Sequence, residues 1–167
     1  FLLMAVEGFS KEEIGHILGK KPAEVLGLLE EASQTIVDQV ATDVLIIEDE
    51  PIIAMDLEAL LESLGHNVTG VARTEQEALK LASTKRPGLV LADIQLADGS
   101  SGIDAVNKML LDFAVPVIFI TAFPERLLTG EKPEPAFLIT KPFMPDMVKA
   151  VVSQALFFDT KSRAAAA

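Results

Sequence analysis

The fold follows from the stretch Val44-Leu45-Ile46-Ile47-Glu48-Asp49, in which an apolar run ends at two carboxylates. Three later apolar runs also end at a polar or charged residue. They are Leu89-Val90-Leu91-Ala92 before Asp93, Val117-Ile118-Phe119-Ile120 before Thr121, and Phe137-Leu138-Ile139-Thr140 before Lys141 and Pro142. If the runs are parallel strands, these polar residues gather at the carboxyl edge of one sheet, which is where open α/β sheets bind ligands.

Strand-like and helix-like patterns alternate from Asp43 onward, which is typical of βα units around a parallel sheet. Five such units can be counted along the chain. The first helix begins at Pro51 and ends at Gly65, the second strand covers about 67–72, and the last helix begins near Pro145. The pattern therefore predicts an α/β domain built on a five-stranded parallel sheet.

Two segments depart from this alternation. Residues 122–135 hold several prolines, which allow at most a short helix near residues 125–128. Residues 1–32 have helical patterns alone, with a capping-box pattern at Ser10 and Glu13 and a break at Gly19, which gives a helix-turn-helix outline. We expect a helix-turn-helix unit over 1–32, a linker or connecting helix over 33–42, the α/β domain over 43–158 and a tail over 159–167.

The composition excludes several classes of protein. With 167 residues and 50% hydrophobic content, the chain can bury a packed core. It has no cysteine, and we interpret its two histidines, His16 and His66, as structural or surface residues, so any metal should be bound by oxygen. The net charge of −11 disfavours binding to nucleic acid. No apolar stretch is long enough to span a membrane, and we expect a cytoplasmic protein.

The residues at the strand ends suit phosphoryl chemistry. Each one alone is more simply interpreted as a helix cap or a turn residue. Capping does not, however, predict the observed relation between the type of charge and the order of the strands. Three ionised carboxylates, on Glu48, Asp49 and Asp93, would repel one another unless they share a cation, and all-oxygen ligation favours Mg²⁺. Asp93 could then attack phosphorus while Lys141 offsets the charge of the transferred group. Thr121 offers a hydroxyl that can bind a phosphoryl oxygen.

This set resembles a response-regulator receiver domain. The resemblance covers residues 43 to about 158 and consists of the acidic pair, Asp93, Thr121-Ala122 and Lys141-Pro142-Phe143, in order and spacing. It implies a (βα)5 flavodoxin-like fold, with a doubly wound parallel sheet of strand order 2-1-3-4-5 and a cis Lys141-Pro142 bond. A histidine kinase or phosphotransfer protein would be the phosphodonor.

The resemblance also assigns roles to residues. Asp93 would be the phosphoacceptor. Mg²⁺ would be bound by Glu48, Asp49, Asp93 and the backbone carbonyl of Gln95, and the phosphoryl group by Thr121, Lys141 and the backbone of Ala122. One position departs from the pattern, since receivers usually carry Tyr or Phe three residues before the lysine and this chain has Leu138. Strand alternation points the neighbouring Phe137 to the other face of the sheet, so we expect an unconventional switch.

The helical segment resembles the last part of a sigma-factor DNA-binding region. The similarity lies in Val6-Glu7-Gly8-Phe9-Ser10-Lys11-Glu12-Glu13-Ile14, followed by Ile17-Leu18-Gly19 and Val25. Residues 1–42 nevertheless contain three lysines against seven acidic residues, a net charge of −4, which is unsuited to DNA. Sigma-like helices before a receiver resemble the PhyR-type regulators of the alphaproteobacterial general stress response. The complete sigma-like domain is then expected to extend before Phe1.

Three functions remain open. The favoured one is a phosphorylation-controlled partner switch, in which phosphorylation of Asp93 releases the intramolecular sigma-like domain to sequester an anti-sigma factor. Such a protein would catalyse only its own phosphoryl transfer and dephosphorylation. The first alternative is a response regulator that binds DNA through the helix-turn-helix. The second is a phosphoaspartyl hydrolase, which is disfavoured because Gln95 stands where such enzymes need a general acid.

Overall fold

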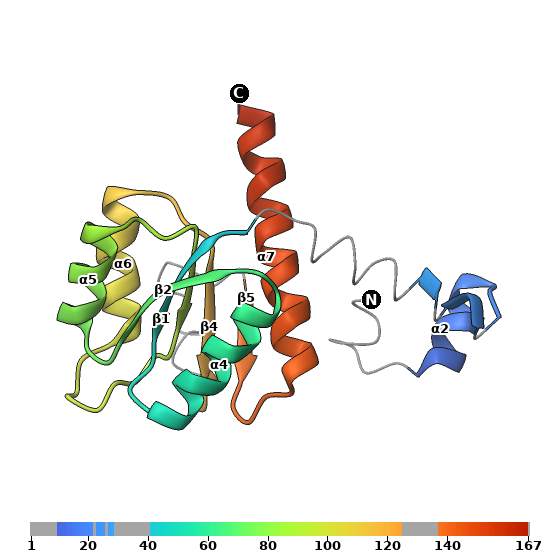
Figure 1. The fold of residues 1–167 in the computed structure, drawn as a ribbon, viewed down its shortest axis with the longest axis horizontal. Coiled ribbons are helices and arrows are strands. Elements are labelled where there is room, and N and C mark those ends of the chain that lie inside the picture. Colours follow the sequence, from blue (N-terminus) through green and yellow to red (C-terminus); the bar gives the residue numbers. More distant parts are fainter. Residues whose placement is uncertain (1–9, 22, 26, 29–40, 125–136, 167) are drawn as a thin grey trace.

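The central feature of the molecule is a five-stranded parallel sheet with the order β2-β1-β3-β4-β5 (Figure 1). The computed structural model describes residues 10–21, 23–25, 27–28, 41–124 and 137–166. The observed strand order confirms the order 2-1-3-4-5 that the receiver resemblance implied. The strands are β1 (Asp43–Ile47), β2 (Asn67–Ala72), β3 (Leu89–Ala92), β4 (Val117–Thr121) and β5 (Phe137–Thr140).

Helices cover both faces of this sheet, which confirms the doubly wound fold. Helices α5 (Glu75–Thr84) and α6 (Gly102–Asp112) pack on one face, and α4 (Pro51–Ser63) and α7 (Pro145–Ala166) pack on the other (Figure 1). Helix α7 continues through residues 159–166, which the sequence interpretation set apart as a tail. Among the described residues, no helix has both the length and the apolar character needed to cross a bilayer.

The strands alternate their side chains between two apolar cores. Leu45 and Ile47 of β1 face α5 and α6, whereas Val44 and Ile46 face α4 and α7. All four are buried, as expected for a strand in a parallel sheet that is covered on both faces. This double burial explains why the decisive stretch is a continuous apolar run, without the polar alternation of a half-exposed strand.

The amino-terminal helical unit is present where the structure describes it. Helix α2 (Lys11–Leu18) begins at the predicted capping box, in which the Ser10 side chain accepts a hydrogen bond from Glu13 N and the Glu13 carboxylate accepts one from Ser10 N. It ends at Gly19, whose φ of 63° lies in the left-handed region that glycine favours. Residues 23–25 and 27–28 are also helical. Residues 1–9 of the expected helix-turn-helix unit, most of the 33–42 linker and the short helix expected near 125–128 lie outside the described residues.

Candidate functional site

The strand register brings the predicted site residues to one edge. Ile47 of β1 pairs with Ala92 of β3, so the residues that follow them, Glu48 and Asp93, lie side by side. Asp93 N donates to Ile47 O at 2.8 Å, and Lys141 N donates to Thr121 O at 2.8 Å, which extends the same arrangement to β4 and β5. The carboxyl edge therefore gathers the set that the sequence pattern indicated.

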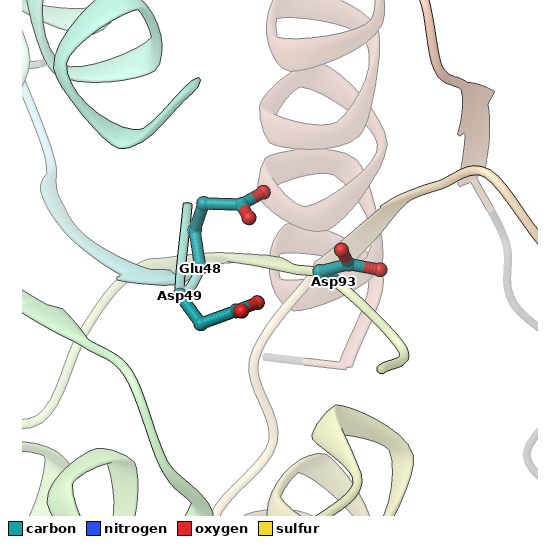
Figure 2. A group of neighbouring side chains, drawn as sticks. All are labelled: Glu48, Asp49 and Asp93. Carbon is teal, nitrogen blue, oxygen red and sulfur yellow. The ribbon is translucent and has the colours of Figure 1, made fainter. Parts of the chain in front are cut away.

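Three carboxylates form a compact acidic cluster at this edge. One oxygen each from Glu48, Asp49 and Asp93 lies within 4.8 Å of the others. Figure 2 shows the carboxylates of Glu48 and Asp49 directed toward Asp93. Glu48 and Asp93 are buried and Asp49 is half-buried, so bulk water screens their mutual repulsion only in part.

Lys141 enters this cluster from the loop after β5. Its Nζ lies 2.7 Å from Asp93 Oδ2, 2.8 Å from Glu48 Oε2 and 3.3 Å from Glu50 Oε1. The Lys141 side chain is 9% exposed, so most of its charge is compensated inside the protein. The peptide bond that follows it, Lys141-Pro142, is cis, as the resemblance implied.

Burial and charge pull the pKa values in this cluster in different directions. Burial raises the pKa of Glu48, and the nearby Lys141 offsets this increase only in part. For Lys141, burial alone would lower the pKa, but its contacts with Asp93 and Glu48 outweigh burial and raise the pKa above the ordinary lysine value. The ammonium is therefore fixed in its charged form, while its charge offsets the effect of burial on Glu48 only in part.

The cluster fits a bound Mg²⁺. Ligand oxygens on opposite sides of Mg²⁺ are about 4.2 Å apart, since each lies roughly 2.1 Å from the ion, and the three carboxylates span little more than that. Glu48 Oε2 is buried and has no hydrogen-bond partner among the described residues, although it is ion-paired with Lys141. A buried carboxylate oxygen without a hydrogen bond is the kind of ligand that a divalent cation would satisfy.

The loop after Asp93 holds its carboxylate in place. Asp93 Oδ1 accepts hydrogen bonds from Ile94 N at 2.5 Å and Gln95 N at 3.3 Å. The loop folds back so closely that a Cβ on Gly102 would lie 1.8 Å from Asp93 O. Gly102 is therefore required for this approach, and Gly102 N secures it by donating to Ile94 O at 3.0 Å.

Thr121 and Leu138 lie on neighbouring strands beside the cluster. Thr121 is buried and its Oγ1 accepts a hydrogen bond from Phe123 N at 3.1 Å. Leu138 packs against the core under α5 and α6, whereas Phe137 packs against the core under α4 and α7. The two side chains thus lie on opposite faces, as strand alternation predicts, and an aliphatic side chain occupies the usual aromatic position.

A pocket of about 380 Å³ opens over the cluster. Its lining includes Asp49, Asp93 and Lys141, together with Gln95 and Ala122 from the predicted set. Glu50 also lines it, and the sequence interpretation assigned this residue no role. The available signal was its place in the acidic run after β1, but only the structure shows that it reaches Lys141. Gly102 was likewise missed, because its role depends on a contact distant in sequence.

The sheet, its two helical layers and the acidic edge with Lys141 define a response-regulator receiver domain. The family model described as "Response regulator receiver domain" matches residues 44–153. A second model, described as "Response regulator PhyR, sigma-like domain", matches residues 1–39. The chain belongs to the PhyR family of response regulators.

Individual relatives agree with this assignment. The chain is 65% identical over 164 residues to the phyllosphere-induced regulator PhyR of Methylorubrum extorquens, covering 98% of this chain and 61% of that protein. It matches the crystal structure of the response regulator PhyR from Brucella abortus with a TM-score of 0.88 and 65% identity, over 99% of this chain and 68% of the other. It also matches Bartonella quintana PhyR in complex with the anti-sigma factor NepR, with a TM-score of 0.54 and 61% identity, over 95% and 65% of the two chains.

Proposed function

We propose that this protein is a phosphorylation-controlled partner switch whose phosphoacceptor is Asp93. The observation that carries the proposal is the placement of the Asp93 carboxylate in the pocket, 2.7 Å from Lys141 Nζ and beside the carboxylates of Glu48 and Asp49. A nucleophile, a fixed positive charge and a cation site thus meet within one opening. The match to the receiver family supports the class of domain on which this proposal depends.

Several residues of the site have distinct proposed roles in phosphoryl transfer. A carboxylate oxygen of Asp93 forms a bond to phosphorus as the bond from phosphorus to the donor breaks, and the donor group keeps the electron pair of that bond. Lys141 Nζ neutralises charge on the transferred oxygens. The Thr121 hydroxyl and the backbone N–H of Ala122 bind the phosphoryl group once it is attached. Mg²⁺, held by Glu48, Asp49, Asp93 and the Gln95 carbonyl, would supply further positive charge at the phosphoryl oxygens.

This chemistry makes the protein a regulator that acts only on itself. Hydrolysis of an external phosphate ester through Asp93 needs a general acid to protonate the leaving group. Gln95 stands two residues after Asp93 and also lines the pocket, but its amide cannot donate a proton in this way. The proposed donor is a histidine kinase or a phosphotransfer protein, and the proposed place of action is the cytoplasm.

The output of the switch is proposed to be an anti-sigma factor. The Bartonella relative is described in complex with such a factor, NepR, and residues 1–39 of this chain match the sigma-like domain of the same family. This chain resembles that complexed relative less closely than it resembles the Brucella protein, at similar identity. The contrast supports a switch in which the chain rearranges when its sigma-like region binds the partner.

A pull-down with a NepR-type anti-sigma factor tests this output. The chain is compared with and without prior incubation with Mg²⁺ and a small acyl phosphate, and Asp93→Asn serves as the control. Capture should increase after phosphorylation of the wild type and stay at its basal level in the variant. Equal capture in all samples, or tight and salt-sensitive binding to promoter DNA in a gel shift, would contradict the proposal.

A further inference from the structure

Lys141 is surrounded by as many carboxylates as it has N–H donors. An ammonium group donates three hydrogen bonds, and Nζ lies within 3.3 Å of one oxygen each from Asp93, Glu48 and Glu50. A phosphoryl group on Asp93 must also be contacted by this ammonium if Lys141 is to offset its charge. A phosphoryl oxygen then competes with these three carboxylates for the Lys141 ammonium.

The three carboxylates differ in how easily they can move away from Lys141. Asp93 is the attachment point, and its Oδ1 is held by the backbone of the following loop. The Glu48 side chain is 1% exposed, and its Oε1 accepts a hydrogen bond from Glu50 N at 3.2 Å, so releasing it would strand a buried charge. The Glu50 side chain is 60% exposed and makes the longest of the three contacts with Lys141. Moving it into water costs the least.

We propose that Glu50 is a positioning residue that occupies Lys141 in the resting state and is displaced by the incoming phosphoryl group. The inference rests on the proposed role of Asp93 as phosphoacceptor. Glu50 lines the pocket, is largely exposed and carries negative charge, so it competes with an anionic phosphodonor for the same ammonium. The contact between Glu50 and Lys141 therefore raises the concentration of phosphodonor needed for half-maximal phosphorylation. It leaves the maximal rate nearly unchanged, because the contact is already broken when Asp93 attacks phosphorus.

Glu50→Gln tests the inference by removing the charge and keeping the size of the side chain. Initial rates of phosphorylation are measured by intact mass against acetyl phosphate concentration at saturating Mg²⁺. The half-saturating concentration should fall about two- to fivefold, as expected for weakening a partly exposed ion pair, while the maximal rate stays nearly unchanged. Glu62→Gln, at the far end of α4, is the matched control and should leave both values as in the wild type.

A second readout does not depend on phosphoryl transfer. Beryllofluoride, a phosphoryl mimic, is titrated against the midpoint of thermal unfolding, and Glu50→Gln should reach half of the full shift at a lower concentration than the wild type. Unchanged half-saturation in Glu50→Gln, or an equal change in Glu62→Gln, would overturn the role of Glu50 while leaving Asp93 as the phosphoacceptor. A wild-type chain that takes up no phosphoryl group would overturn both.

Discussion

The ammonium of Lys141 stabilises carboxylates that the fold has already brought together. Glu48 and Asp93 lie against it at 2.8 and 2.7 Å, and both are buried. In this position one cation serves two purposes, because it lowers the cost of burying the acidic cluster and it faces the pocket where a phosphoryl group would enter. The stability of the site and its proposed reactivity are therefore linked through a single side chain.

Lys141→Met should expose this link. Removing one partner of a buried ion pair leaves uncompensated charge, so we expect the free energy of unfolding to fall by about 3 kcal/mol without Mg²⁺. Mg²⁺ should then stabilise the variant more than the wild type, because it would replace the lost positive charge. Urea denaturation with and without Mg²⁺ measures both effects.

Lys85→Met is the matched control for this experiment. It breaks the pair between Lys85 and Asp43, in which the lysine side chain is 55% exposed, so the loss of stability should be much smaller and Mg²⁺ should not restore it. An equal response of the two variants to Mg²⁺ would contradict a cation site beside Lys141.

His66 gives the protein a pH-dependent stability away from the acidic cluster. It is buried, and its Nδ1 accepts a hydrogen bond from Thr42 N at 3.4 Å, which requires an unprotonated nitrogen. Burial lowers the pKa of His66. Below pH about 6.5 the unfolded chain takes up a proton that the folded chain does not, so the free energy of unfolding should fall by at most about 1.4 kcal/mol per pH unit.

Urea denaturation at pH 7.5 and pH 5.5 measures this loss. His66→Asn keeps a side-chain acceptor but does not titrate, so its stability should change less between the two values than that of the wild type. His16→Asn, at an exposed position, should retain the wild-type dependence. If His66→Asn and the wild type lose the same stability, the pH dependence has another origin.

At the level of single residues, prediction of the site depended on spacing along the chain. The strand-end pattern indicated Glu48, Asp49, Asp93, Thr121 and Lys141, because parallel strands place their carboxyl ends at one edge. Glu50 and Gly102 could not be recognised in this way. The role of Glu50 depends on reaching a lysine 91 positions later, and that of Gly102 on the close return of a loop.

Among the elements, α6 is the one that begins where the site loop ends. Its N-cap is Ser101, whose side chain accepts hydrogen bonds from Ile103 N at 3.1 Å and Asp104 N at 3.4 Å. The next residue, Gly102, contacts the backbone of Asp93. The start of α6 therefore fixes both the helix and the loop that holds the Asp93 carboxylate.

Ser101→Ala should destabilise the domain by about 1 kcal/mol, because it leaves the first N–H groups of α6 without their side-chain acceptor. Amide hydrogen exchange should accelerate in the first turn of α6. Ser101→Asn, which restores an acceptor, should recover most of the loss. Equal destabilisation by both substitutions would show that packing at this position matters more than the cap.

Element boundaries followed from the sequence where local chemistry sets them. Pro51 begins α4, the Ser10 and Glu13 pair begins α2, and the second strand covers the predicted residues 67–72. The continuation of α7 through residues 159–166 was not predicted, although the alanines after residue 163 permit a helix and the segment contains no stop signal.

At the scale of the whole chain, a receiver is combined with a helical unit of the wrong charge for DNA. The net charge of the chain is −11, and residues 1–42 contribute −4 of it. The charge of both parts therefore disfavours electrostatic attraction to the phosphate backbone of a nucleic acid. The same charge favours a basic protein partner. At this scale the sequence predicted the two-part organisation, whereas the relative arrangement of the parts depends on contacts that no local pattern encodes.

The central claim is that Asp93 accepts a phosphoryl group with the help of Mg²⁺. The most direct measurement is the intact mass of the chain after incubation with acetyl phosphate, with Mg²⁺ and with EDTA, for the wild type and for Asp93→Asn. We predict one phosphoryl adduct on the wild type in Mg²⁺ and none on the variant or in EDTA. A wild-type chain without an adduct, or an adduct that persists in Asp93→Asn, would contradict the account.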